Sequence, residues 1–170
     1  MVQMREETAA DFEAIRKVNR QAFGDEPVAQ LVDQLRADGV VIISLVAVDG
    51  EDVVGHVLFS ETPMTTHGGE TLPGATLSPL AVVPARQRTG IGTALVRRGI
   101  ELCRERGIVA ILLIGHPEYY PRFGFSSALA RQIASKYSTI ADPYMALELV
   151  SDVLSGGVTA IVPTAFELVE

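Results

Sequence analysis

What this sequence lacks excludes several kinds of protein. It has one cysteine, so no internal disulfide can form, and its three histidines show none of the spacings of metal ligands. No apolar run reaches the roughly 18 residues that a transmembrane helix needs. The opening Met-Val-Gln-Met-Arg-Glu-Glu lacks the basic and apolar stretches of a secretory signal. We therefore expect a cytoplasmic protein with no bound metal and no membrane partner.

Length and charge narrow the class further. The 170 residues match the roughly 100 to 200 residues of one domain, and 48% of them are hydrophobic, which is enough for a full core. The formal net charge is −7. Because nucleic-acid binders usually carry a broad basic surface, we expect no nucleic-acid partner. These features predict a single domain over residues 1–170.

The pattern of residues 77–107 predicts a strand, a tight loop and a helix. Leu77–Val83 is a short apolar run with branched residues at its end, and Pro84 stops it. Apolar residues then recur at helical spacing, charged residues occupy the opposite face, and Gly107 is the expected carboxy-terminal stop. The apolar face consists of Ile91, Leu95, Gly99, Leu102 and Cys103. This position predicts that Cys103 is a core residue rather than a nucleophile.

The loop before this helix has the features of a phosphate-binding site. Gly90 and Gly92 have no Cβ, so an anion can approach the backbone N–H groups that lack an intrahelical partner at the helix start. The helix dipole also favours negative charge there. Residues 86–106 contain six arginines and two acids, a local net charge of +4 in an acidic chain. The charges alone would suit a solvated helix face, but together with the glycines and the strand they favour a phosphorylated small molecule.

Residues 83–95 resemble the acetyl-CoA-binding signature of the GNAT superfamily of N-acetyltransferases, Gln/Arg-x-x-Gly-x-Gly/Ala. Gln87, Gly90 and Gly92 fill its fixed positions. The resemblance implies that acetyl-CoA is the cosubstrate, with its pyrophosphate on backbone N–H groups of this loop. The residues implied are Gln87, Arg88, Thr89, Gly90, Ile91, Gly92 and Thr93. A dinucleotide-binding Gly-x-Gly-x-x-Gly motif fails, because Leu95 occupies the third glycine position.

A second resemblance follows in residues 109–125. Val109–Gly115 predicts a strand, and the later Tyr120-x-x-Phe123-Gly124-Phe125 resembles the family's Tyr-x-x-x-Gly-Phe element. Two elements in the family's order support the resemblance more than either one alone. The sequence of residues 116–125 is similar to that of a branch of predicted bacterial acetyltransferases.

The rest of the chain also follows the family's order of elements. The implied architecture is α/β (α+β-like), a GNAT fold with a mixed central β-sheet of about seven strands flanked by helices on both faces. Further strands are expected at Val2–Glu6, Val40–Val48, Val53–Phe59, Tyr144–Val150 and Ala160–Val162, and helices after Thr8 and over Pro27–Ala37. The first helix is expected to bury a stripe of Phe12, Ile15, Val18, Asn19 and Ala22.

Two stretches rich in glycine or proline are expected to be loops, Thr62–Ala75 and Ser151–Thr159. Two interpretations stay open for the first stretch. Either it borders the acceptor pocket, together with the second stretch, or it is only a loosely structured hairpin.

Acetyl transfer to an amine needs a donor for the oxyanion and an acid for the departing thiolate. The resemblance places the oxyanion donor, and the pairing with the pantetheine arm, at Leu80, Ala81 and Val82. Tyr120 holds the position of the family's acid. A shift of one residue would give that role to Tyr119, and a tyrosine packed at a turn is the other interpretation of Tyr120.

The general base is less well defined. His116 and Glu118 precede the expected acid and are candidates, and Glu61 is a third. For His116 a cap or turn role is the alternative. Leu113 and His116 also stand where many family members carry an asparagine and an alanine, so the contacts credited to that asparagine do not transfer to this chain.

The predicted function is direct transfer of an acetyl group from acetyl-CoA to a primary amine of a small molecule or a peptide, by a monomer or a homodimer. The first 61 residues carry twelve acids and five basic residues, which would suit a cationic acceptor. The alternative is a non-catalytic acyl-CoA-binding regulatory or sensor domain that acts through a partner. A nicotinamide-dependent enzyme is a third possibility, and it would bind NADH instead.

Overall fold

The computed structural model describes residues 1–24 and 26–170. These residues form two compact units, each built from separate stretches of the chain. The first unit comprises Met1–Ser60, Ser78–Leu102 and Thr164–Glu170, and the second comprises Glu61–Leu77 and Cys103–Pro163. That residues 1–170 act as a single domain stays a prediction. Among the described helices, none is long and apolar enough to cross a bilayer.

The first unit contains strands in the order β1, β2, β3 and β6, with antiparallel pairing from β1 to β2 and from β2 to β3. The strands are β1 (Val2–Glu6), β2 (Val41–Asp49), β3 (Asp52–Glu61) and β6 (Gly74–Val82), of which Ser78–Val82 belongs to this unit. The helices are η1 (Ala9–Asp11), α1 (Phe12–Phe23), α2 (Pro27–Ala37), η2 (Pro84–Arg86), α3 (Ile91–Glu105), of which Ile91–Leu102 belongs to this unit, and η4 (Thr164–Val169).

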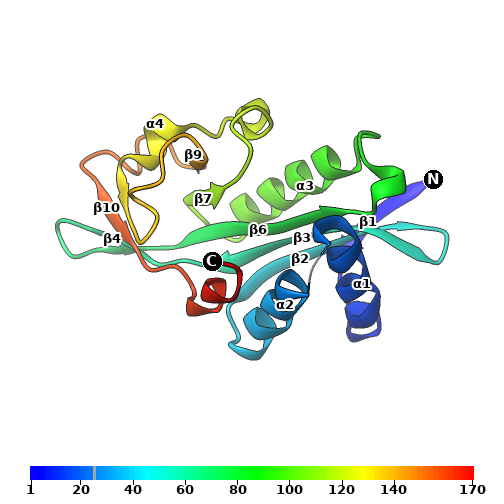
Figure 1. The fold of residues 1–170 in the computed structure, drawn as a ribbon. Helices are drawn as coiled ribbons and strands as arrows, with labels where there is room; N and C mark the ends of the chain where they lie inside the picture. Colours follow the sequence, from blue (N-terminus) through cyan, green and yellow to red (C-terminus); the bar gives the residue numbers. More distant parts are fainter. Residues whose placement is uncertain (25) are drawn as a thin grey trace. The chain divides into compact units, whose positions relative to one another are not determined.

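Alternation along β3 decides what each face of these strands carries, because successive side chains point to opposite faces. A Cβ on Gly55 would lie 3.0 Å from side-chain atoms of Ile91 and Leu95, so this face packs against α3. The next residue, His56, contacts Asn19 of α1. Figure 1 shows α3 on one side of the strands and α1 and α2 on the other. Helices therefore cover both faces, as expected.

The second unit contains two groups of strands. Gly74–Thr76 of β6 pairs in parallel with β7 (Ala110–Ile114), which pairs antiparallel with β9 (Tyr144–Glu148). A smaller sheet has the order β5, β4, β10, β8. Its members are β4 (Met64–Thr66), β5 (Thr71–Leu72), β8 (Ile133–Ala134) and β10 (Val158–Ala160), and the short helices of this unit are η3 (Tyr120–Phe123) and α4 (Ser127–Ala130).

Most predicted elements are confirmed, and three details are corrected. The stretch Thr62–Ala75 is not a plain loop, because β4 and β5 form a hairpin, as one of its two interpretations expected, and β4 also pairs with β10. The last strand lies at Val158–Ala160 rather than at Ala160–Val162. The predicted burial of Phe12 is wrong, because its side chain is 37% exposed and lies under the guanidinium of Arg36, 4.0 Å from the ring centre.

A fully buried histidine joins β3 to its neighbours in the first unit. Nδ1 of His56 lies 3.2 Å from Nδ2 of Asn19, which also donates to the carbonyl of Ile15, and Nε2 lies 2.9 Å from Oγ of Ser44. An amide nitrogen only donates, so Nδ1 accepts and Nε2 carries the proton. The ring is therefore neutral. Burial, and secondly the charge of Arg36, lowers the pKa of His56 from 6.5 to about 3.

We expect His56 to make stability depend on pH. The unfolded chain binds a proton on this side chain below pH 6.5, whereas the folded protein binds it only near pH 3. The free energy of unfolding should therefore fall as the pH drops through this window, by up to about 1.4 kcal/mol per pH unit. His56→Gln keeps hydrogen-bonding groups but removes the titration. Urea unfolding of both proteins across this pH range should give a flatter profile for the variant; parallel profiles would contradict the assignment.

Helix α3 lies very close to β3 at Gly99. A Cβ on Gly99 would lie 2.2 Å from Cε2 and 2.5 Å from Cζ of Phe59, whose ring is fully buried. The whole predicted apolar face of the helix is buried, including Ile91 and Leu95. The glycine therefore provides the space for the aromatic ring.

We expect Gly99→Ala to lower the free energy of unfolding by about 1–3 kcal/mol, since the added methyl group overlaps the ring of Phe59. The better helix propensity of alanine, about 1 kcal/mol, offsets only part of this. A double-mutant cycle with Phe59→Leu, measured by urea unfolding, supplies the control. The same substitution should cost less in the Leu background, and a single variant more stable than the native protein would contradict the proposed overlap.

Candidate functional site

The connection from β6 to α3 has an unusual backbone. β6 ends at Val82 and α3 begins at Ile91, which confirms the predicted strand, loop and helix. Between them, Arg88 has a φ of 61° and Gly90 a φ of 91°. Glycine adopts such angles readily, but for an arginine they are strained by about 1–3 kcal/mol, and strain of this kind is concentrated at functional sites.

Side-chain hydrogen bonds hold this loop in place. Nε2 of Gln87 donates to the carbonyl of Val82 over 3.0 Å, and Oγ1 of Thr89 donates to the carbonyl of Arg86 over 2.5 Å. The guanidinium of Arg86 in turn donates to Asp49 over 2.7 Å and lowers the pKa of that carboxyl group. Gln87 therefore braces the loop through its side chain.

Gly90 leaves open space at the start of α3. A Cβ built on it would have no atom within 4 Å beyond its chain neighbours. Its carbonyl accepts the N–H of Ala94 over 3.0 Å, so Gly90 is the cap and the N–H groups of Ile91 and Gly92 have no acceptor within the helix. These donors and the helix dipole suit an anionic group such as a phosphate.

The arginines of residues 86–106 differ in whether an acidic side chain pairs with them. Arg86 pairs with Asp49, and Arg98 pairs with Glu101 over 3.0 Å. Arg88 is exposed, and its side chain has no partner among the residues that the structure describes. It is therefore the loop arginine whose charge is available to an anion.

Leu80, Ala81 and Val82 form the last part of β6, as the sequence predicted. Ala81 is buried, and its two neighbours are half-buried. The ladder between β6 and β7 uses Gly74–Thr76, so it does not engage these three residues. Their contact with an oxyanion or with pantetheine stays a prediction.

Tyr120 belongs to an aromatic cluster in the second unit. Its ring centre lies 5.0 Å from that of Tyr119, 5.9 Å from that of Phe125 and 6.3 Å from that of Phe123. A Cβ on Gly115 would lie 2.4 Å from Cε2 of Tyr120, so the ring occupies the space that a side chain at Gly115 would need. The strand end and the turn after it together position this tyrosine.

The two adjacent tyrosines have different surroundings. Tyr120 is 9% exposed, and no described residue forms a hydrogen bond with its hydroxyl group. Burial, and secondly the nearby Tyr119, raises the pKa of Tyr120 above its ordinary value of 10, so the phenol is protonated at neutral pH. Tyr119 is half-buried, and the guanidinium of Arg122 lies 4.3 Å from its ring centre.

The candidate bases are all exposed. The carbonyl of His116 accepts the N–H groups of Tyr119 and Tyr120 over 3.1 and 3.4 Å, so the backbone of His116 closes the turn into η3. Within residues 1–24 and 26–170, no partner orients the side chains of His116, Glu118 or Glu61. Their assignment as bases stays a prediction.

Cys103 is a buried residue of α3, which confirms its predicted place in the core. Burial raises the pKa of its thiol to about 12, so it is not a nucleophile at neutral pH. The described part of the chain has no group of three histidine, cysteine or acidic side chains that could hold a metal ion.

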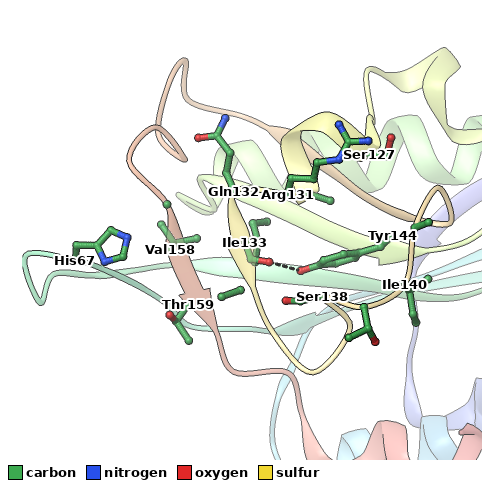
Figure 2. Close-up of a pocket in the computed structure, with 15 residues that line it drawn as sticks. His67, Ser127, Arg131, Gln132, Ile133, Ser138, Ile140, Tyr144, Val158 and Thr159 are labelled. Atoms are coloured by element: carbon green, nitrogen blue, oxygen red, sulfur yellow. Dashed lines mark hydrogen bonds between the residues drawn. The ribbon is translucent and has the colours of Figure 1, made fainter.

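A cavity of about 630 Å³ lies in the second unit, and Figure 2 shows the residues that line it. The stretches at residues 62–75 and 151–159 both contribute to it, the first through His67 and the second through Gly157–Thr159. That they border the acceptor pocket stays a prediction. The sequence alone did not indicate Arg131 or Tyr144, which also line it. These two residues are distant in the chain from the stretches that the glycines and prolines pointed to.

Comparison with known proteins identifies the class. Residues 3–128 match the family model described as an acetyltransferase (GNAT) domain. The matched range includes the loop at Gln87–Gly92 and the element at Tyr120–Phe125. The chain belongs to the GNAT acetyltransferase family.

The chain has relatives that are similar over nearly its whole length. It is 32% identical to the uncharacterized N-acetyltransferase YhbS of Escherichia coli over 160 residues, which cover 94% of this chain and 93% of that protein. The YhbS crystal structure with CoA superposes with a TM-score of 0.88 at 30% identity, over 98% of this chain and 92% of that one. A GNAT acetyltransferase of Brucella melitensis with acetyl-CoA gives a TM-score of 0.78 at 32% identity, over 98% of each chain. The expected fold is confirmed.

Proposed function

We propose that this chain transfers the acetyl group of acetyl-CoA directly to a primary amine. The observation that carries the proposal is the start of α3, where Gly90 leaves space and the N–H groups of Ile91 and Gly92 lack acceptors within the helix. Relatives that were crystallised with CoA and with acetyl-CoA support the same donor. We also propose a single cytoplasmic GNAT domain, monomeric or homodimeric.

The loop would bind the pyrophosphate of acetyl-CoA through backbone groups. Residues 87–93 contribute donors, the side chain of Gln87 keeps the loop in shape, and Arg88 adds a free positive charge. The strained φ of Arg88 helps to direct backbone N–H groups towards one point. Bound acetyl-CoA would supply an activated thioester, and the residues of this chain would position it.

The chemistry assigns one task to β6 and one to Tyr120. As the amine attacks the thioester carbonyl, negative charge develops on its oxygen, and a backbone N–H of Leu80–Val82 would stabilise it. Tyr120 would then donate its proton to the departing thiolate. Because burial keeps the phenol protonated, the proton is available at neutral pH. Its raised pKa also makes full transfer to a thiolate of pKa about 8.5 unfavourable, which limits how much rate the acid contributes.

Deprotonation of the amine is proposed for His116 or Glu118. Both are exposed, so either one would act on a solvated amine, directly or through a water molecule. Neither side chain is held by a partner within the described residues. A residue of this kind is expected to contribute less to the rate than a base held in place by hydrogen bonds.

We expect Gly92→Val to weaken binding of acetyl-CoA by about tenfold or more, because a branched side chain occupies the first turn where the phosphate approaches. Calorimetric titration with acetyl-CoA measures this, with NADH as the negative control ligand. Gly68→Val is the matched variant, since a Cβ there meets only Thr66 Oγ1 at an ordinary 3.8 Å. Unchanged affinity in a folded Gly92→Val protein would contradict the loop assignment, and binding of NADH in place of acetyl-CoA would indicate a nicotinamide-dependent protein.

We expect Tyr120→Phe to lower turnover by about 100-fold while leaving the affinity for acetyl-CoA within about twofold, as loss of a general acid does. Release of the CoA thiol reports turnover with a panel of amines that includes a lysine peptide, a free amino acid, a polyamine and an aminoglycoside. Tyr119→Phe is the control and should keep most activity. If Tyr119→Phe is the inactive variant, the acid is misassigned. If the native protein binds acetyl-CoA but turns over no amine, a regulatory domain becomes the better interpretation.

A further inference from the structure

The cavity of about 630 Å³ in the second unit has the size of a small-molecule site. Its walls come from α4 and the residues after it, from β8, from the segment before β9, from β10 and from the turn of the β4–β5 hairpin. Figure 2 shows these walls around Tyr144, with His67 at one end of the drawn lining and Ile140 at the other. Nothing in the chemistry proposed above uses this cavity.

Hydrogen bonds connect several of the segments that line the cavity. β8 pairs in parallel with β10, and the hydroxyl of Tyr144 donates to the carbonyl of Ile133 over 3.1 Å, the bond drawn in Figure 2. That hydroxyl also lies 3.0 Å from Oγ of Ser135, while Oγ of Ser138 accepts the N–H of Ser135 over 2.8 Å. These bonds therefore hold the segment before β9 to itself and, through Tyr144, hold the start of β9 to β8.

One permanently charged side chain lines the cavity, that of Arg131, and His67 lines it as well. Among the residues that the structure describes, no aspartate or glutamate does. Within the described chain, neither of these two side chains has a hydrogen-bond or ion-pair partner. An arginine of this kind is suited to a bidentate contact with a carboxylate.

The position of His67 depends on the neighbouring Gly157. A Cβ on Gly157 would lie 3.1 Å from Nε2 of His67, and Gly157 has a φ of 86°. A larger residue would be strained there and would crowd the imidazole. The glycine therefore lets the ring lie against the start of β10, at the edge of the cavity.

The remaining lining mixes apolar residues with uncharged polar ones, among them Ser127, Gln132 and Ser138. Ala130, Ile133 and Val158 are buried and line the cavity, and Ile140 lies at its rim. Hydroxyl groups of Thr139 and Thr159 add polar contacts. Apolar residues beside one arginine match an organic acid better than an inorganic ion, which would make no use of the apolar residues.

We infer that this cavity binds a small organic carboxylate with an apolar body, with the carboxylate on Arg131 and His67 and the apolar body on Ile133, Val158 and Ile140. Within the described part of the chain, the lining has one permanent positive charge, no acid and several apolar residues, and these features set the class of ligand. A cationic amine would meet Arg131 without a compensating acid.

The test uses phenylbutyrate, which has no amine and so cannot be an acetyl acceptor, against its neutral analogue phenylbutyramide and the cation phenylbutylamine. Binding to the full chain is measured by calorimetry without acetyl-CoA. We expect the carboxylate to bind about tenfold to a hundredfold more tightly than the amide, since it adds a charge-assisted hydrogen bond. Equal binding of the three, tighter binding of the amine, or no binding of any would overturn the inference.

Two variants locate the site. Arg131→Gln should remove about the same tenfold to hundredfold preference for the carboxylate, while Arg104→Gln, an exposed arginine of α3 outside the lining, should keep it. Ala141→Phe, at an exposed lining position, should block all binding by filling the space without changing charge. A preference that persists in Arg131→Gln, or that is lost equally in Arg104→Gln, would show that the carboxylate binds elsewhere. Neither outcome depends on transferase activity, so a failure of the proposed function is recognised separately.

Discussion

The first unit depends on how closely α3 can lie against β3. Two glycines make this possible from opposite sides: Gly55 of the strand faces Ile91 and Leu95, and Gly99 of the helix faces Phe59. With side chains at these positions the helix would have to move away from the strands. The start of α3 would then no longer follow the end of β6 in its present position. The backbone donors at the start of α3, which we propose to bind phosphate, are thus placed by the packing of this helix against β3.

The loop could be predicted from the sequence because its determinants are local. One short stretch contains an apolar strand, a proline that ends it, two glycines and an amphipathic helix. Each of these features determines the local backbone conformation directly. The same holds for the buried face of α3 and for Cys103. The role of Gln87 was harder to predict from the sequence, since its hydrogen bond to the carbonyl of Val82 depends on the return of the chain through η2. The side chain of Gln87 thus supports the backbone of the loop, and binding of a cofactor by that loop stays a prediction.

The second unit was less predictable because its contacts join distant parts of the chain. β5, β8 and β10 are each two or three residues long, too short for a period in hydrophobicity to show, and the parallel pairing of β8 with β10 joins residues about 25 positions apart. Arg131 and Tyr144 gave no signal of a cavity, because a single arginine or tyrosine is compatible with any surface. Phe12 was misplaced for a related reason, since periodicity places it on the buried stripe but not under the guanidinium of Arg36.

The burial of Cys103 in α3 determines how the native protein reacts with thiol reagents. The chain has one thiol, and in the folded protein it is inaccessible and protonated across the working pH range. Disulfide reagents and maleimides should therefore leave the native protein unmodified. A single cysteine introduced on the exposed surface of either unit would then be the residue that reacts. With one introduced cysteine in each unit, a pair of labels would allow the separation of the two units to be followed in solution.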